Sequence, residues 1–170
     1  EFLLPAPQTE LPGGYQGLAV EVQGLAGGHS GEDIHKGRGN ANALLARFLQ
    51  KALPQKIRLA EVRGGTVRVA LTRSCRAVLA VPGEAVPHLQ AMTAQFEQEL
   101  RAEYRGTAPE LRLTATPMDC PQKAASEADT EKFVQAMLLL PNGIKEMNGA
   151  YREVVEASCN LGEVYQNENG

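Results

Sequence analysis

Apolar and polar residues alternate in the first regular segment of this chain and repeat with helical spacing in the second. From Leu18 to Val22 every second side chain is apolar, which is typical of a strand with one buried face, here over residues 17–25. Across residues 41–53 the apolar residues recur three or four positions apart and stop at Pro54. This spacing predicts an amphipathic helix that ends at the proline. Its N-cap is expected to be Asn40 or Asn42.

The same two spacings recur through the middle of the chain. Alternation predicts four further strands, over residues 57–63, 67–72, 76–81 and 111–116. A helical stripe predicts a second helix from Pro82-Gly83 to Tyr104. Short loops between the three middle strands favour an antiparallel meander. One antiparallel sheet covered on one face by two helices would bury the apolar face of every predicted strand and helix. The sequence therefore predicts an α+β fold of ferredoxin-like type.

The segments on either side of this core are predicted to extend it. Residues 1–16 contain three prolines and a Gly-Gly pair, which indicates an extended linker. After the core, the pattern predicts a helix that begins at Ser126 and stops before Pro141. Alternation over residues 153–165 then predicts one long strand with a bend at Gly162. This helix and strand form a C-terminal extension of the domain.

Composition narrows the class of protein without indicating a function. A chain of 170 residues with 43% hydrophobic and 22% charged residues fits one ordinary globular domain. The net charge of -3 gives no basic bias towards nucleic acid or anionic membranes. No apolar run approaches the ~20 residues that span a bilayer. We therefore expect no nucleic-acid partner and no membrane partner.

The cysteines and the first residues bear on the compartment. Cys75, Cys120 and Cys159 are widely spaced and odd in number, which argues against a disulfide framework and against a structural zinc site. Reduced thiols favour a cytoplasmic protein. The N-terminus lacks a methionine and a basic segment, so we expect no signal peptide and a chain cut from a longer polypeptide.

The strongest candidate for a catalytic or binding segment is Gly27-Gly28-His29-Ser30-Gly31, directly after the first predicted strand. Glycine lets the backbone adopt positive φ and approach other surfaces closely. A histidine presented there has a ring nitrogen free to bind and changes its charge near neutral pH. The alternative is an ordinary strand-ending turn whose histidine is merely exposed.

The rest of the chain supplies no catalytic machinery around His29. The two other histidines are His35 and His88, and none of the three has the spacing of a hydrolytic zinc site. The chain also lacks a Gly-x-Ser-x-Gly nucleophile elbow and a phosphate-binding Gly-Lys-Ser/Thr sequence. We therefore expect no metal site in this chain, and a domain that lends one group to a site built elsewhere.

Four motifs spread over nearly the whole chain form a recognisable set. They are Gly24-Leu25-Ala26-Gly27-Gly28-His29-Ser30-Gly31, Ile34-His35-x-Gly37-x-Gly39-Asn40-Ala41-Asn42, Gly64-Gly65-x-x-Arg68-x-Ala70 and Ser158-x-Asn160-Leu161-Gly162. Together they resemble the aminoacyl-histidine dipeptidases of the zinc-dependent M20 peptidase group. The resemblance implies that residues 17–170 are the lid and dimerisation domain of such an enzyme. It implies that residues 1–16 link this domain to an absent catalytic domain.

The resemblance also implies roles for individual side chains. The histidine that matches His29 reaches the active site, typically that of the partner subunit, where it binds the substrate carbonyl and the developing oxyanion. Asn160 is implied as a second substrate-binding residue. One departure is Val69, which stands where the family has an asparagine that contacts substrate.

The function implied is hydrolysis of Xaa-His dipeptides. Two zinc ions and a glutamate general base belong to the catalytic domain, so the chain alone is expected to be inactive and to hold no metal. The implied partners are a dipeptide substrate, the enzyme's own catalytic domain and a second subunit in a homodimer. The competing interpretation is a non-enzymatic α+β module that dimerises or binds a small ligand, because missing metal ligands fit either case.

Overall fold

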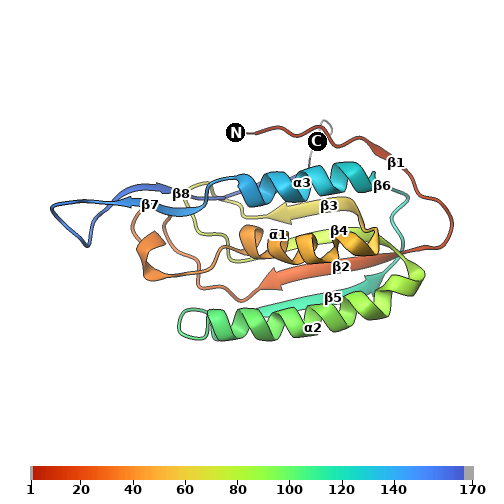
Figure 1. Ribbon diagram of the computed structural model, residues 1–170, viewed down its shortest axis with the longest axis horizontal. Coiled ribbons are helices and arrows are strands. Elements are labelled where there is room, and N and C mark those ends of the chain that lie inside the picture. Colours follow the sequence, from red (N-terminus) through yellow and green to blue (C-terminus); the bar gives the residue numbers. More distant parts are fainter. Residues whose placement is uncertain (1, 167–170) are drawn as a thin grey trace.

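The fold is built on a five-stranded sheet with the strand order β5-β2-β4-β3-β9 (Figure 1). The computed structural model describes residues 2–166. The strands are β2 (Tyr15–Gln23), β3 (Arg58–Gly64), β4 (Cys75–Pro82), β5 (Arg112–Met118) and β9 (Val164–Tyr165). All neighbours are antiparallel. The chain order and sheet order of the four longer strands are those of a ferredoxin-like fold, as the sequence predicts.

Three helices cover one face of this sheet, with α1 between the other two (Figure 1). They are α1 (Ala41–Ala52), α2 (Val86–Glu103) and α3 (Glu127–Leu139). Phe48 of α1 meets Phe96 of α2 with ring centroids 6.2 Å apart, and Val134 of α3 is buried in the same core. The predicted extension helix is thus part of the main helix layer. No helix in the described part of the chain is long and apolar enough to cross a bilayer.

Capping contacts confirm two predicted helix starts. Asn40 Oδ1 accepts the backbone N–H groups of Asn42 at 3.0 Å and Ala43 at 3.3 Å, which satisfies donors that a helix start leaves unpaired. Ser126 Oγ accepts the N–H of Asp129 at 3.0 Å. Short 3-10 turns flank two further helix boundaries: η2 (Leu53–Gln55) follows α1, and η3 (Gly83–Ala85) precedes α2.

The predicted strand over residues 67–72 is wrong. β3 pairs directly with β4, with Gly64 opposite Cys75, so residues 65–74 leave the sheet as a loop, which we call the 65–74 loop. Val67 and Val69 in this loop are 49% and 55% exposed. Their alternation with polar residues therefore does not mark a buried strand face.

The predicted strand over residues 153–165 is two separate strands. β8 (Val155–Cys159) pairs with β7 (Gly143–Met147) in a hairpin that projects from the body (Figure 1). β9 instead joins the edge of the main sheet. The chain breaks between β8 and β9 because its carbonyls there accept hydrogen bonds from the side chains of Asn42 and Thr72 rather than from a neighbouring strand.

Part of the segment predicted to be a linker is bound to the domain. β1 (Gln8–Glu10) pairs with β6 (Lys123–Ala125) in a two-stranded sheet. Arg58 of β3 holds this sheet in place, because its guanidinium donates to the carbonyls of Ala124 at 3.1 Å and Ala125 at 2.8 Å.

Candidate functional site

His29 lies in the loop that connects β2 to the 3-10 turn η1 (Ile34–Lys36). The preceding Gly28 has a φ of 137°, a backbone conformation that favours glycine. A Cβ at this position would collide with the side chains of Asp33 and Arg38. Glycine is therefore required for the turn that brings His29 to the surface.

The backbone at His29 is paired with the 65–74 loop. His29 lies opposite Ala70 in an isolated antiparallel bridge. This bridge sets the direction of the main chain at His29. Two hydrogen bonds of 2.8 Å close it, from Ser30 N–H to the Val69 carbonyl and from Leu71 N–H to the Gly28 carbonyl.

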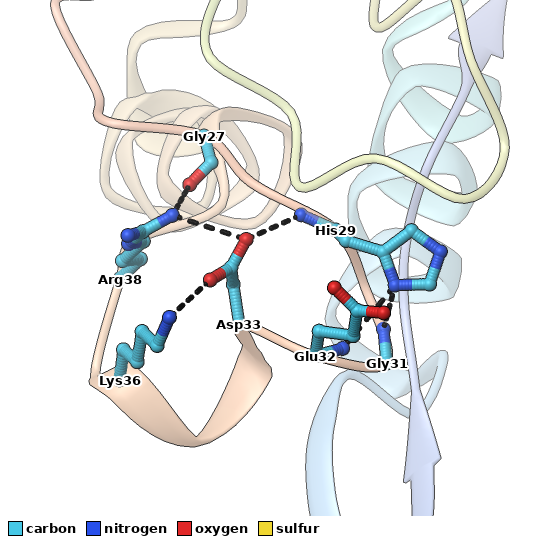
Figure 2. Close-up of polar contacts among 7 residues, drawn as sticks. All are labelled: Gly27, His29, Gly31, Glu32, Asp33, Lys36 and Arg38. Carbon is cyan, nitrogen blue, oxygen red and sulfur yellow. Dashed lines mark hydrogen bonds and ion pairs between the residues drawn. The ribbon is translucent and has the colours of Figure 1, made fainter.

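Asp33 holds the same loop from the other side (Figure 2). Its Oδ2 accepts the N–H of His29 at 2.8 Å and lies 3.3 Å from the guanidinium of Arg38. Its Oδ1 lies 2.6 Å from Lys36 Nζ. The hydrogen bond from Lys36, followed by that from the His29 backbone, lowers the pKa of Asp33 to about 2. Asp33 is therefore ionised near neutral pH and anchors the His29 peptide.

The imidazole of His29 is exposed, and one of its nitrogens is already occupied. Nδ1 accepts the backbone N–H groups of Gly31 and Glu32, both at 3.2 Å (Figure 2). A ring nitrogen that accepts carries no proton, so the neutral ring has its proton on Nε2. No other group among residues 2–166 bonds to Nε2. The Nε2–H group is thus presented to solvent as a hydrogen-bond donor.

Among residues 2–166 no hydrogen bond joins Asn160 to His29, but both residues pair with Ala70. Asn160 Nδ2 donates to the carbonyls of Arg68 at 3.1 Å and Ala70 at 2.8 Å. Its Oδ1 accepts from Asn40 Nδ2 at 3.2 Å. Both N–H groups and the oxygen of this amide are therefore used inside the domain. They hold the 65–74 loop to the start of α1.

A cluster of amide and hydroxyl groups stabilises the break between β8 and β9. Asn142 Oδ1 accepts the N–H of Leu161 at 3.1 Å, and Asn42 Nδ2 donates to the Leu161 carbonyl at 2.9 Å. Thr72 Oγ1 donates to the Gly162 carbonyl at 2.7 Å. Sequence reasoning missed this cluster. In the sequence Asn42 is only a candidate helix cap and Asn142 only a turn residue, because their partners lie 119 and 19 residues away.

The described residues offer no set of metal ligands. Among residues 2–166 there is no group of three or more histidine, cysteine, aspartate or glutamate side chains that could hold a metal ion. His35 and His88 are exposed and do not join His29. Zinc, which the family resemblance implies, thus does not fit this part of the chain.

Burial raises the pKa of the Cys75 thiol to about 12, so Cys75 stays protonated and inert near neutral pH.

Comparison with known proteins identifies the family of this chain. Residues 20–108 match the family model of the M20 peptidase dimerisation domain, and the chain belongs to this family. The match confirms the M20 resemblance that the four motifs carry.

Two dipeptidases match nearly the whole chain. The cytosol non-specific dipeptidase of Escherichia coli (strain K12) is 32% identical over 160 residues, which are 94% of this chain and 33% of that protein. The crystal structure of aminoacylhistidine dipeptidase from Vibrio alginolyticus is 32% identical and has a TM-score of 0.93, covering 97% of this chain and 34% of that one. This chain therefore spans about a third of the length of each relative.

Proposed function

We propose that this chain is the lid and dimerisation domain of an M20-type dipeptidase and supplies His29 to a catalytic site outside the described residues. The observation that carries the proposal is the state of the imidazole. Two backbone N–H groups hold Nδ1, so the ring presents Nε2–H outward. The two dipeptidase relatives, which cover 94% and 97% of the chain, support the same assignment.

A fixed N–H donor stabilises negative charge that grows during peptide hydrolysis. Attack on the peptide carbonyl places that charge on the carbonyl oxygen, and one preorganised donor at this oxygen lowers the barrier by roughly 3–4 kcal/mol. His29 is suited to this task because the bridge to Ala70 and the hydrogen bond to Asp33 fix its backbone in advance. No rearrangement is then needed at the moment of reaction.

The finer assignments belong to the same proposal. The substrate is a dipeptide of Xaa-His type, in line with the name of the Vibrio alginolyticus relative. Asn160 contributes to substrate binding by holding the 65–74 loop, to which its amide donates. The zinc ions and the general base belong to the catalytic portion of the full-length enzyme. That enzyme is a homodimer in the cytoplasm, in line with the dimerisation-domain family and the cytosolic relative.

Substitution of His29 in the full-length protein tests the proposal. His29→Ala is expected to lower kcat by roughly 10²–10³-fold, the loss on removing one oxyanion donor. Zinc content and the unfolding midpoint are expected to stay the same. His35→Ala is the matched control, because His35 is also exposed and lies six residues along the same segment. Unchanged kcat in His29→Ala would contradict the catalytic role of His29. Absence of dipeptidase turnover in the unsubstituted full-length protein would instead favour a non-enzymatic binding module.

A further inference from the structure

The hairpin formed by β7 and β8 (residues 143–159) has no part in the proposed function. It projects from the body at the end that carries the loop between β2 and α1 (Figure 1). β7 lies against η1, the turn that begins five residues after His29. The hairpin also lies outside residues 20–108, the part matched by the family model.

The hairpin exposes apolar side chains and has no core of its own. Tyr151 is 71% exposed and Val154 50%, and Ile144 and Met147 are each 39% exposed. No hydrophobic side chain between residues 141 and 160 belongs to the core. A two-stranded hairpin is marginally stable without support from another surface. Four exposed apolar side chains on one short hairpin favour an interaction site.

The 65–74 loop also exposes apolar side chains, and it is hydrogen-bonded to the chain directly after the hairpin. Asn160, directly after β8, bonds to the carbonyls of Arg68 and Ala70 in that loop, where Val67 and Val69 are exposed. Six of the twelve exposed large hydrophobic side chains in the described chain lie on these two segments. They therefore concentrate at the end of the domain that presents His29.

Hydrogen bonds of Asn148 hold the tip of the hairpin in a defined turn. Asn148 Oδ1 accepts the N–H groups of Ala150 and Tyr151, both at 2.9 Å. Its backbone N–H donates to the Val154 carbonyl at 2.8 Å, and its Nδ2 donates to Glu156 Oε2 at 2.6 Å. Tyr151 and Val154 are thus presented on a fixed turn, which reduces the entropy lost on docking.

The charges on the hairpin do not favour binding to a polyanion such as nucleic acid or an anionic membrane. Its charged side chains mix both signs without a basic cluster: Lys145, Glu146, Arg152, Glu153 and Glu156. Nucleic acid and anionic membranes require a concentrated positive field. Exposed tyrosine, methionine and valine side chains fit a protein partner, because aromatic residues and methionine are enriched in protein–protein interfaces.

We infer that the hairpin docks through Met147, Tyr151 and Val154 on the catalytic portion of a second copy of the full-length protein. This inference rests on the proposed function, because a body close enough to receive His29 also faces the hairpin at the same end of the domain. This chain covers 33% and 34% of its two relatives, which leaves ample chain to form that body. The family is a dimerisation domain, which favours a second copy over the same chain.

A photocrosslinker at the hairpin tip tests the inference directly. A benzophenone side chain at position 151 of the full-length protein is expected to give a covalent dimer on irradiation. Mass spectrometry is expected to map the link to the catalytic portion of the other copy. The control carries the same group at position 118, since Met118 is 40% exposed but pairs with the first part of β2, opposite Gly17. A link within one chain, a link to another region, or no product above the control overturns the inference.

A substitution measures the energetic contribution of the tip. Tyr151→Ser combined with Val154→Ser is expected to raise the dimer Kd about tenfold or more, as the loss of a buried aromatic anchor does. Met118→Ser is expected to leave the dimer Kd unchanged, and all proteins are checked for an unaltered unfolding midpoint. His29→Ala is expected to keep both the cross-link and the dimer Kd. Loss of turnover in His29→Ala without a cross-link at position 151 would therefore overturn the docking alone.

Discussion

The side-chain amide of Asn160 donates a hydrogen bond of 2.8 Å to the carbonyl of Ala70, 90 residues earlier in the chain. Ala70 is also the residue that lies opposite His29 in the antiparallel bridge. Asn160 thus acts on the imidazole through a single intervening backbone. The exposed donor and the amide cluster at the end of β8 are parts of one arrangement.

Removal of the Asn160 amide is expected to misplace His29. Asn160→Ala in the full-length protein removes the hydrogen bonds that the amide donates to the carbonyls of Arg68 and Ala70. We expect kcat to fall by roughly 10–100-fold, because small errors in the position of a catalytic group are costly. Measurement of kcat and KM for one dipeptide, with the unfolding midpoint as a control for folding, checks this expectation.

A double variant separates positioning from direct substrate contact. If Asn160 acts only through His29, Asn160→Ala combined with His29→Ala is no slower than His29→Ala alone, since residues that act as one unit are not additive. A full multiplicative loss of kcat in the double variant would show that Asn160 contacts the substrate independently.

Acid is expected to loosen the His29 loop through Asp33. The pKa of Asp33 is lowered from 3.8 to about 2, first by the hydrogen bond from Lys36. A lowered carboxyl pKa gives stability that is present above the unfolded value and is lost as the pH falls through the folded value. The free energy of unfolding should therefore drop between pH 3.8 and about 2. In Asp33→Asn this part of the drop is absent, and urea unfolding of both proteins measures the difference. Superimposable pH profiles would contradict the assignment.

The contact between α1 and α2 should be costly to remove. Phe48 is fully buried, and its ring lies 6.2 Å from that of Phe96. Phe48→Ala is expected to lower the free energy of unfolding by roughly 3–5 kcal/mol, the range for an aromatic residue removed from a core. Leu139→Ala is the control, because Leu139 is 84% exposed and its change should stay within about 0.5 kcal/mol. Denaturant unfolding with equal changes for the two variants would show that α1 does not pack as described.

The sheet and its helices could be predicted because their signals are local. Alternation in β2 and the apolar stripe of α1 report which side of each element faces the core. The same logic fails for residues 67–72, where Val67 and Val69 alternate with polar residues but face outward. This segment forms hydrogen bonds with Gly28, Ser30 and Asn160, which are far away in the sequence, and no periodic pattern encodes these partners.

Local sequence signals likewise predict only part of the candidate site. The glycines around His29 predict an exposed histidine, because a glycine at position 28 permits the positive φ of this turn. The tautomer of the imidazole cannot be predicted from the sequence, since it depends on the N–H groups of Gly31 and Glu32, which turn back towards Nδ1. The amide cluster around Leu161 is hidden for a related reason, because its members come from distant segments that meet only in the folded domain.

The direction in which His29 acts is testable with mixed dimers. One subunit carries His29→Ala, and the other keeps His29 but has an inactivated catalytic portion. If His29 serves the partner, the mixed dimer unites one intact catalytic portion with one intact His29 from the other chain, and activity returns at one of its two sites. Each variant alone is expected to remain nearly inactive. Two affinity tags isolate the mixed dimer, and turnover is measured per mixed dimer. Recovery is expected because the imidazole presents its Nε2–H outward, and this group forms no hydrogen bond with residues 2–166. Isolated mixed dimers without recovered turnover would place the action of His29 within its own chain.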